Sequence, residues 1–323
     1  MRYTIRHVTR FTYESPISEN VMELRMQPRT DSRQRCIQFT LTTTPAARML
    51  TYNDHDGNIV HHFNIPGRHS RLAITAVALV DCDPPQAMPD RLAPDAWQEL
   101  DGLGGSGEYW ELLAPSTFAA RTALLDGFAR EIGLERAGDP LVTLRGLMAK
   151  MYDRLEYQPK STRVDSPIDD ALESRQGVCQ DFTHIFLALA RGLGVPARYV
   201  SGYLFPEVNH HDRSAEGATH AWAEVLLPGY GWVGMDPTNN MLAQERHIRV
   251  ALGRDYADVP PTRGVYKGTT ALRSELAVSV RVGPVTVFAD DETLPFTPWM
   301  SRDVGTPARD AETGLQQQQQ QQQ

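Results

Sequence analysis

Apolar and polar residues alternate along most of the first 82 positions of the chain. Side chains two positions apart lie on one face of a strand, so this period predicts strands with one buried face. The alternating sets are Tyr3, Ile5 and His7; Met22, Leu24 and Met26; Ile37, Phe39 and Leu41; and Ile59, His61, Phe63 and Ile65. An apolar run over 72–80 adds a buried strand, and Asp56-Gly57-Asn58 predicts a turn. We therefore expect residues 1–82 to form a β-rich N-terminal module, an antiparallel sandwich or barrel.

Prolines interrupt this alternation after residue 82. Four of them stand between positions 84 and 94. Proline fixes φ and lacks an N–H group, so residues 83–114 are expected to form a junction rather than a central strand or helix.

From about residue 115 the apolar spacing becomes helical. The first predicted helix shares one apolar face among Phe118, Leu125, Phe128 and Ile132, with Ser116 or Thr117 as its cap. A second helix should begin with Asp139 as N-cap and Pro140 in the first turn, where a missing N–H costs nothing. A third should begin near Cys179 and end at Gly194 and Pro196.

Strand patterns return after the third helix, at 199–204, 220–226 and 232–235, with a turn at 228–231 and a late alternation at Val278, Val280 and Val282. Residues 115–290 are thus expected to form an α+β core of helices packed on an antiparallel sheet. The segment 291–323 ends in eight glutamines and offers little apolar surface to bury, which predicts a disordered tail.

The composition is that of a folded protein, since 41% of the 323 residues are hydrophobic and 22% are charged. The net charge of −8 argues against nucleic acid as a partner, because phosphate binding needs concentrated positive charge. The chain starts without a long apolar run, and no stretch reaches the ~18 apolar residues of a transmembrane helix. We expect no secretion signal, no membrane contact and a cytoplasmic location, whereas the oligomeric state stays open.

Three cysteines, Cys36, Cys82 and Cys179, are too few and too scattered for a disulfide framework or a zinc site. Cys36 lies in a strand pattern and Cys82 at the junction, so both favour a structural interpretation. Cys179 lies at a predicted helix start, where free N–H groups and the positive end of the helix dipole stabilise a thiolate. A thiolate is a strong nucleophile, although a lone cysteine at a helix start is more often structural.

A nucleophilic cysteine needs a base that returns the proton to the leaving group. His220 begins a predicted strand, and Asp236 ends the next strand of a predicted hairpin. Counting from the turn leaves the two residues about three positions out of register, which a bulge or a leading loop would have to absorb. The order Cys179, His220, Asp236 nevertheless predicts a nucleophile, a general acid/base and a residue that orients the imidazole.

Other chemistry-bearing residues favour ordinary structural roles. The triplet His210-His211-Asp212 resembles a metal site, but its polar surroundings favour a solvated loop. Asp181 could shape substrate contacts or simply cap its helix. Trp222 and Trp232 are expected in the core rather than as substrate platforms.

Four motifs resemble the core of the bacterial transglutaminase-like superfamily: GVCQDF at 177–182, GVPARYVSGY at 194–203, THAWAE at 219–224 and WVGMDPT at 232–238. The resemblance covers roughly residues 145–240, and residues 1–80 look like the β-rich module that often precedes this core. It implies a papain-like arrangement in which Cys179 forms a thioester acyl-enzyme, His220 transfers protons and Asp236 orients His220.

The resemblance leaves the reaction open. It implies a cysteine-dependent hydrolase of peptide or isopeptide bonds, or a transglutaminase-type transfer of an acyl group from glutamine to an amine. A non-catalytic interaction module is the third alternative. A peptide or protein substrate is expected, without cofactor or metal, because the acidic cluster of a calcium-dependent enzyme is not apparent. Tyr157 and Gln176 are candidates for a side-chain oxyanion donor beside the Cys179 N–H.

Overall fold

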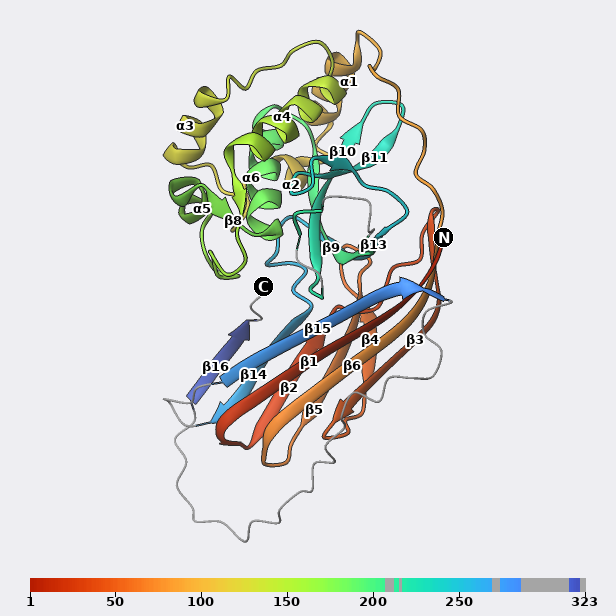
Figure 1. Cartoon of the computed structure of the whole chain (residues 1–323), viewed down its shortest axis with the longest axis vertical. Helices are drawn as coiled ribbons and strands as arrows, with labels where there is room; N and C mark the ends of the chain where they lie inside the picture. The colour runs from red at the N-terminus through yellow and green to blue at the C-terminus, as the bar shows by residue number, and fades with distance from the viewer. Residues whose placement is uncertain (207–211, 215–216, 269–273, 286–313, 320–323) are drawn as a thin grey trace.

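The computed structural model describes residues 1–206, 212–214, 217–268, 274–285 and 314–319. Two antiparallel sheets form one part of the molecule, drawn at the bottom of Figure 1. The first sheet has the order β15 (Ser274–Pro284), β1 (Arg2–Ile17), β6 (His69–Cys82) and β3 (Gln34–Thr44). The second has the order β16 (Gly314–Gln319), β14 (Thr262–Gly268), β2 (Glu19–Leu24), β5 (Ile59–Ile65) and β4 (Leu50–Asn53).

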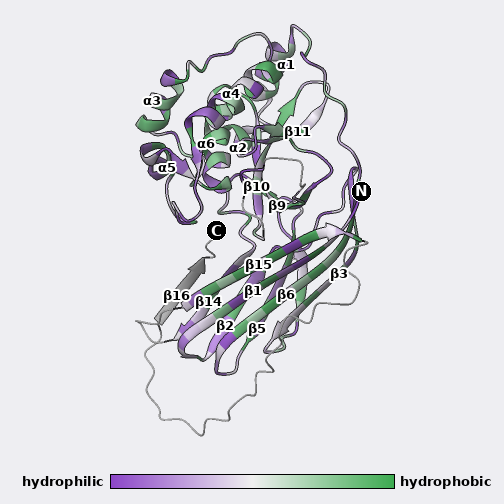
Figure 2. Ribbon diagram, viewed as in Figure 1, coloured by the Kyte–Doolittle hydropathy of each residue, from purple (hydrophilic) through white to green (hydrophobic). Residues whose placement is uncertain are grey.

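The two sheets enclose a common apolar core. One sheet contributes Phe11, Ile17, Leu72 and Ile74, and the other contributes Met22, Leu24, Phe63, Ile65 and Tyr266. Each fully buried apolar side chain contributes roughly 1.5–3 kcal/mol relative to exposure. Figure 2 shows hydrophobic and hydrophilic positions alternating along β1 and β6. The predicted antiparallel sandwich is confirmed.

The chain returns to this sandwich after the central sheet. β14 pairs with β2, and β15 pairs with β1 over Tyr3 to Tyr13. Residues 262–284, which the sequence assigned to the core, therefore pair with the N-terminal strands. Period-two alternation predicts a strand, but the partner of a strand depends on contacts remote in sequence.

Part of the C-terminal segment also differs from the predicted disorder. Gly314–Gln319 forms β16, whose backbone pairs antiparallel with β14. Backbone hydrogen bonds at a sheet edge do not require apolar side chains, which explains why composition gave no signal for this strand. Residues 291–313 and 320–323 of the predicted tail lie outside the described residues.

A second part of the molecule packs helices against a five-stranded antiparallel sheet. The sheet order is β12 (Met241–Leu242), β11 (Gly231–Asp236), β10 (His220–Leu227), β9 (Ala197–Leu204) and β13 (His247–Gly253). The helices are α1 (Ala96–Ser106), α2 (Trp110–Leu113), α3 (Ala123–Glu131), α4 (Pro140–Arg154), α5 (Ile168–Ser174) and α6 (Cys179–Gly192). β7 (Glu156–Tyr157) and β8 (Gln176–Gly177) form a short parallel pair. The α+β class is confirmed.

Helix starts follow local capping chemistry, with two corrections. Asp139 caps α4 as predicted, accepting the N–H groups of Leu141 and Val142. The cap of α3 is Thr122, not Ser116 or Thr117, and Phe118 precedes that helix. α1 lies inside the predicted junction. The four prolines between positions 84 and 94 all precede Ala96, so the backbone N–H groups of α1 are free to form helical hydrogen bonds. None of the helices in the described part of the chain is long and apolar enough to cross a membrane.

Two residues of the sandwich, Gln34 at the start of β3 and Asn58 just before β5, hold strand β13 of the central sheet. Gln34 accepts the N–H of Arg249 at 2.8 Å and donates to its carbonyl at 2.8 Å. Asn58 makes the same reciprocal pair with the backbone of Leu252, at 2.7 and 2.8 Å. The sandwich thereby fixes the strand that carries His247.

Candidate active site

Cys179 is the first residue of α6 and is buried, with 3% of its surface exposed. Its carbonyl accepts the hydroxyl of Thr183 at 2.8 Å. Gly177 lets Asp181 approach, since a Cβ at Gly177 would lie 2.9 Å from Asp181 Cβ. Asp181 Oδ2 then accepts the Val178 N–H at 2.8 Å and the Thr162 hydroxyl at 2.5 Å. These contacts fix the helix start and therefore the direction of the cysteine side chain.

Asp181 is a helix cap and not a surface carboxylate. Burial raises its pKa to about 6, although the hydrogen bonds from Thr162 and Val178 act in the opposite direction. Of the two interpretations that the sequence left open, the contacts of Asp181 fit the cap.

His220 and Asp236 lie in contact, with His220 Nε2 and Asp236 Oδ2 2.7 Å apart. The β10–β11 register runs regularly from Leu227–Gly231 to Ala223–Met235. Extending this register puts Asp236 opposite Trp222, two residues from His220 and on the same face. The contact is thus diagonal across the pair, and neither a bulge nor a leading loop is needed to absorb the offset.

Five donors converge on the Asp236 carboxylate. Oδ2 accepts from His220, from Asn239 Nδ2 at 2.7 Å and from His247 Nε2 at 3.1 Å. Oδ1 accepts the backbone N–H groups of Thr238 at 3.1 Å and Asn239 at 3.2 Å. Burial opposes ionisation, but His220 and His247 hold the pKa of Asp236 well below its usual range. An ionised Asp236 requires His220 to carry a proton on Nε2.

His247 is a neutral imidazole with a fixed tautomer. Its Nδ1 lies 3.1 Å from the backbone N of Gln244 and accepts that N–H. The ring proton is therefore on Nε2, from which it is donated to Asp236. Burial lowers the pKa of His247, more than the Asp236 carboxylate raises it, in agreement with the neutral form.

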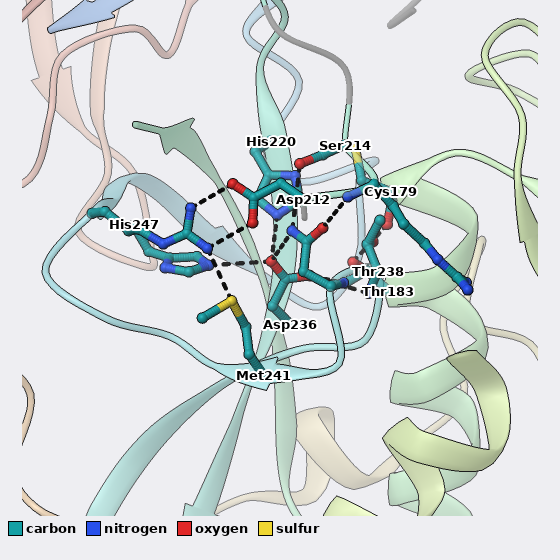
Figure 3. Close-up of polar contacts among 12 residues, drawn as sticks. Cys179, Thr183, Asp212, Ser214, His220, Asp236, Thr238, Met241 and His247 are labelled. Carbon is teal, nitrogen blue, oxygen red and sulfur yellow. Dashed lines mark hydrogen bonds and ion pairs between the residues drawn. The ribbon is translucent and has the colours of Figure 1, made fainter. Parts of the chain in front are cut away.

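The second ring nitrogen of His220 faces Cys179. His220 is 2% exposed, and its Nδ1 has no hydrogen-bond partner among the described residues at ordinary geometry. Burial alone would lower the pKa of His220, but the Asp236 carboxylate and then the Cys179 sulfur raise it to about 10. Trp222 stacks on the imidazole, with ring centroids 5.9 Å apart. Figure 3 shows Cys179 beside His220 and the bonds that converge on Asp236.

The cluster of His220, Asp236 and His247 has the residue types of a metal site, and their ligand atoms lie within 4.8 Å of one another. Tetrahedral ligands at about 2.0–2.1 Å from an ion would be roughly 3.3 Å apart. The two nitrogen–oxygen distances, 2.7 and 3.1 Å, are shorter and fit hydrogen bonds. Because Nε2 of His247 carries a proton, the cluster fits proton transfer better than metal binding.

Cys36 and Cys82 are the other two cysteines of the chain. Burial raises the pKa of Cys82 to about 12, and burial also raises that of Cys36. Both groups stay protonated at neutral pH, and neither contacts His220. A structural role remains the simpler interpretation of Cys36 and Cys82.

The two oxyanion candidates occupy different positions. Tyr157 pairs with Gly177 in the β7–β8 ladder, two residues before Cys179. Gln176 lies on the exposed side and donates to Glu156 at 3.2 Å. Of these two residues, Tyr157 is better placed, and the role of each stays a prediction.

Two of the other residues that the sequence singled out, Trp222 and Trp232, line one cavity. Trp222 is buried, as expected, and Trp232 is half-buried. His210 and His211 lie outside the described residues. Asp212 forms a two-pronged ion pair with buried Arg246, at 2.6 and 2.7 Å.

Sequence reasoning missed His247 and Asn239, which both bond Asp236. His247 begins a strand pattern over 247–252, as His220 does in its own strand, and that parallel was available. Asn239 closes a turn that begins at Asp236, and an Asp followed by polar residues is a common turn signal. That both would bond one carboxylate depends on the fold of the sheet.

Comparison with known proteins gives consistent matches over most of the chain. Residues 127–237 match the transglutaminase-like superfamily, and residues 3–81 match the bacterial transglutaminase-like N-terminal region. An uncharacterized protein of Mycobacterium leprae is 32% identical over 280 residues, covering 86% of this chain and 98% of its own length. An uncharacterized protein of Mycobacterium tuberculosis is 35% identical over 293 residues, covering 88% of this chain and 93% of its own.

Two further matches concern activity and fold. A protein-glutamine gamma-glutamyltransferase of Pseudomonas aeruginosa is 29% identical over 139 residues, covering 38% of this chain and 21% of its own. The crystal structure of a candidate cysteine protease from Cytophaga hutchinsonii superposes with a TM-score of 0.69 and covers 98% of both chains. Its sequence identity of 20% makes this a likeness of fold alone.

Proposed function

Because the chain belongs to the transglutaminase-like superfamily, we propose that it is a cysteine-dependent hydrolase of peptide or isopeptide amide bonds. One observation carries the proposal. His220 is bound through Nε2 to an ionised carboxylate at 2.7 Å, which leaves Nδ1 for the Cys179 thiol.

At neutral pH the proton of Cys179 lies on His220 Nδ1, since the pKa of His220 is raised to about 10. In the first step, the sulfur of Cys179 attacks the carbonyl carbon of the substrate. The carbonyl oxygen becomes an oxyanion while the C–S bond forms. As the oxyanion collapses, the C–N bond breaks and His220 gives its proton to the leaving amine. The product at this stage is a thioester on Cys179 and a free amine.

In the second step, water loses a proton to His220 and attacks the thioester carbonyl. Collapse of this second intermediate breaks the C–S bond and releases the sulfur, while the proton taken from water stays on His220. Asp236 stays ionised throughout, because five donors hold it, and stabilises the imidazolium.

The oxyanion needs donors at about 2.7–3.1 Å from the position where the charge develops. The N–H of Cys179 is a first-turn amide of α6 and therefore has no acceptor within the helix. Tyr157, beside Gly177 in the ladder, is our candidate for a second donor.

A thiol-directed acyl probe tests this mechanism. We expect labelling at neutral pH to be lost in Cys179→Ala and retained in Cys36→Ala and Cys82→Ala. Equal labelling of all three variants would overturn the proposal. Peptide libraries incubated with purified protein would then show which amides are cleaved.

Acyl transfer to an amine is the second candidate function. It is favoured by the local similarity to the Pseudomonas aeruginosa gamma-glutamyltransferase, and the same three residues serve. Incubation with a glutamine donor and a labelled amine separates the two reactions. Label in the product supports transfer, whereas free acid and ammonia support hydrolysis.

A further inference from the structure

A cavity lies on the face of the central sheet away from α6. Along β10, Ala221, Ala223 and Val225 pack in the same core as α6, so the alternating residues Trp222 and Glu224 face the other side. A cavity of about 690 Å³ opens there. This volume is within the ~300–1,000 Å³ usual for small-molecule sites. Cys179 and His220 do not line the cavity, whereas Trp222 and His247, which contact His220 and Asp236, do.

Both parts of the molecule contribute to its walls. The sandwich provides residues 29 and 31–34, and the junction provides residues 83 and 85–88. The central sheet provides residues of β9, β10, β11, β12 and β13. The hydrogen bonds of Gln34 with Arg249, at 2.8 Å, fix the start of β3 against β13. The cavity is therefore formed where the two parts pack against each other and is not a depression in the surface of one part.

The cavity wall is cationic in a chain that is acidic overall. It contains five arginines, namely Arg29, Arg33, Arg145, Arg198 and Arg249. Four acidic residues, namely Asp31, Asp83, Glu224 and Glu245, leave a formal charge of +1, against −8 for the whole chain.

The best-buried acid of this wall is already neutralised. Glu224, 2% exposed, accepts from Arg198 at 2.6 Å and from Arg249 at 3.4 Å. Arg249 also pairs with Asp31 at 2.8 Å. These pairs hold two of the five guanidinium groups in place.

The other three guanidinium groups have no carboxylate partner in the described part of the chain. Arg29 donates to the Asn58 side chain at 2.6 Å, and Arg33 and Arg145 donate to backbone carbonyls at 3.4 and 3.3 Å. Burial, and then the charge of Arg198, lowers the pKa of Arg29. An anion in the cavity would relieve this repulsion and receive charge-assisted hydrogen bonds.

The wall also offers apolar surface next to the arginines. The guanidinium of Arg198 lies 4.0 Å from the ring centroid of Trp232. Further apolar side chains in the wall are those of Met88, Trp222, Leu242 and Leu252. A ligand with one negative charge and an apolar group would match both features, whereas a doubly charged phosphate exceeds the net charge of the wall.

We propose that this cavity binds a small monocarboxylate that carries an apolar group, with its carboxylate on the unpaired arginines and its apolar group against the tryptophans. The free acid and the C-terminus of a short peptide share this chemistry. The cavity adjoins the catalytic cluster through Trp222 and His247 but does not include Cys179. Its test measures binding without turnover and therefore does not depend on the proposed reaction.

Isothermal titration of the full chain tests the proposal with N-acetyl-leucine as the probe and N-acetyl-leucinamide as the uncharged isostere. We expect saturable one-to-one binding of the acid and at least tenfold weaker binding of the amide. Arg33→Gln should weaken binding of the acid at least tenfold, since it removes one charge-assisted contact. Arg35→Gln is the matched control, because Arg35 is exposed, pairs with Asp81 and does not line the cavity. It should change the affinity less than twofold.

N-acetyl-glycyl-leucine distinguishes the two ligand sources. Tighter binding than N-acetyl-leucine identifies peptide C-termini, and equal or weaker binding identifies free acids. Thermal unfolding checks that each variant is folded, and Arg145→Gln, with the same expected loss, replaces Arg33→Gln if the latter is not. The proposal is overturned if the acid shows no saturation up to on the order of 10 mM. Equal affinity for acid and amide, tighter binding of inorganic phosphate, or unchanged affinity in the arginine variants would overturn it as well.

Discussion

Replacing Asp236 by Asn isolates the charge that holds His220 as an imidazolium. The pKa of His220 is about 10 against an ordinary value of 6.5, a difference worth on the order of 5 kcal/mol. Burial acts against this shift, so the Asp236 carboxylate is the main source of it, with Cys179 second. The Asn side chain keeps an oxygen for the Thr238 and Asn239 N–H groups but removes the charge.

Without that charge, burial governs, and we expect the pKa of His220 to fall below 6.5. The amide can also turn its N–H toward Nε2, which would place the ring proton on Nδ1, facing the thiol. A comparable change in a serine-protease triad costs about 10⁴ in rate. We expect the acylation rate of Cys179 at neutral pH to fall roughly 10³–10⁴-fold.

Two measurements follow the substitution without knowledge of the substrate. Side-chain ¹⁵N NMR of histidine between pH 5 and 10.5 reports the titration of His220. Iodoacetamide alkylation of the Cys179 peptide, read by mass spectrometry, reports the thiolate. Asp101→Asn is the control, because Asp101 is an ion-paired carboxylate at the surface, bound to Arg136 at 2.7 Å. A His220 that still titrates above pH 9 in Asp236→Asn, or alkylation within tenfold of wild type, would refute the reasoning.

Three further substitutions have distinct outcomes. The raised pKa of Asp181, about 6 against an ordinary value of 3.8, gives stability that is present below pH 3.8 and lost as pH rises through 6. Asp181→Asn should therefore make the free energy of unfolding less dependent on pH between pH 4 and 6. Urea unfolding above pH 6 should show the variant to be more stable than the wild type by up to about 3 kcal/mol. Gly177→Ala should displace the start of α6, since the new Cβ would lie 2.9 Å from Asp181 Cβ. We expect alkylation of Cys179 to slow at least tenfold, and a smaller decrease would contradict this. Tyr157→Phe should lower kcat about 10²-fold with little change in KM, whereas Gln176→Ala should stay within threefold; the reverse order would exchange their roles.

The protonation of His220 also links activity to stability. A histidine whose pKa is raised from 6.5 to about 10 contributes stability that is complete below pH 6.5 and lost as pH rises through 10. Asp236→Asn should lack this contribution, so the two proteins should approach equal stability at high pH.

The elements that local chemistry determines could be predicted from the sequence. Asp139 and Pro140 mark the start of α4, and the apolar stripe after Cys179 marks α6, because caps and helical periods are properties of neighbouring residues. Alternation likewise predicted the strands of the sandwich. Thr122 was missed as a cap because Ser116 and Thr117 offer the same chemistry six and five residues earlier.

Features that depend on remote pairing could not be predicted in this way. The alternation at Val278, Val280 and Val282 predicts a strand but does not show that it joins β1. The order of residues along the chain suggested Cys179, His220 and Asp236. It could not show that His247 donates to Asp236, because His247 lies in β13, at the opposite edge of the sheet. The cationic cavity is formed by five arginines spread from position 29 to 249 and has no local signature.

Trapping of the acyl-enzyme tests the central claim most directly. Intact-protein mass spectrometry after brief mixing with an activated acyl-amide donor should show one added acyl group, which peptide mapping locates on Cys179 and which hydroxylamine removes. The adduct should form without added amine or metal and should be absent in Cys179→Ala. An adduct on Cys36 or Cys82, or none on Cys179 in a folded protein that cleaves the donor, would contradict a thioester mechanism at this site.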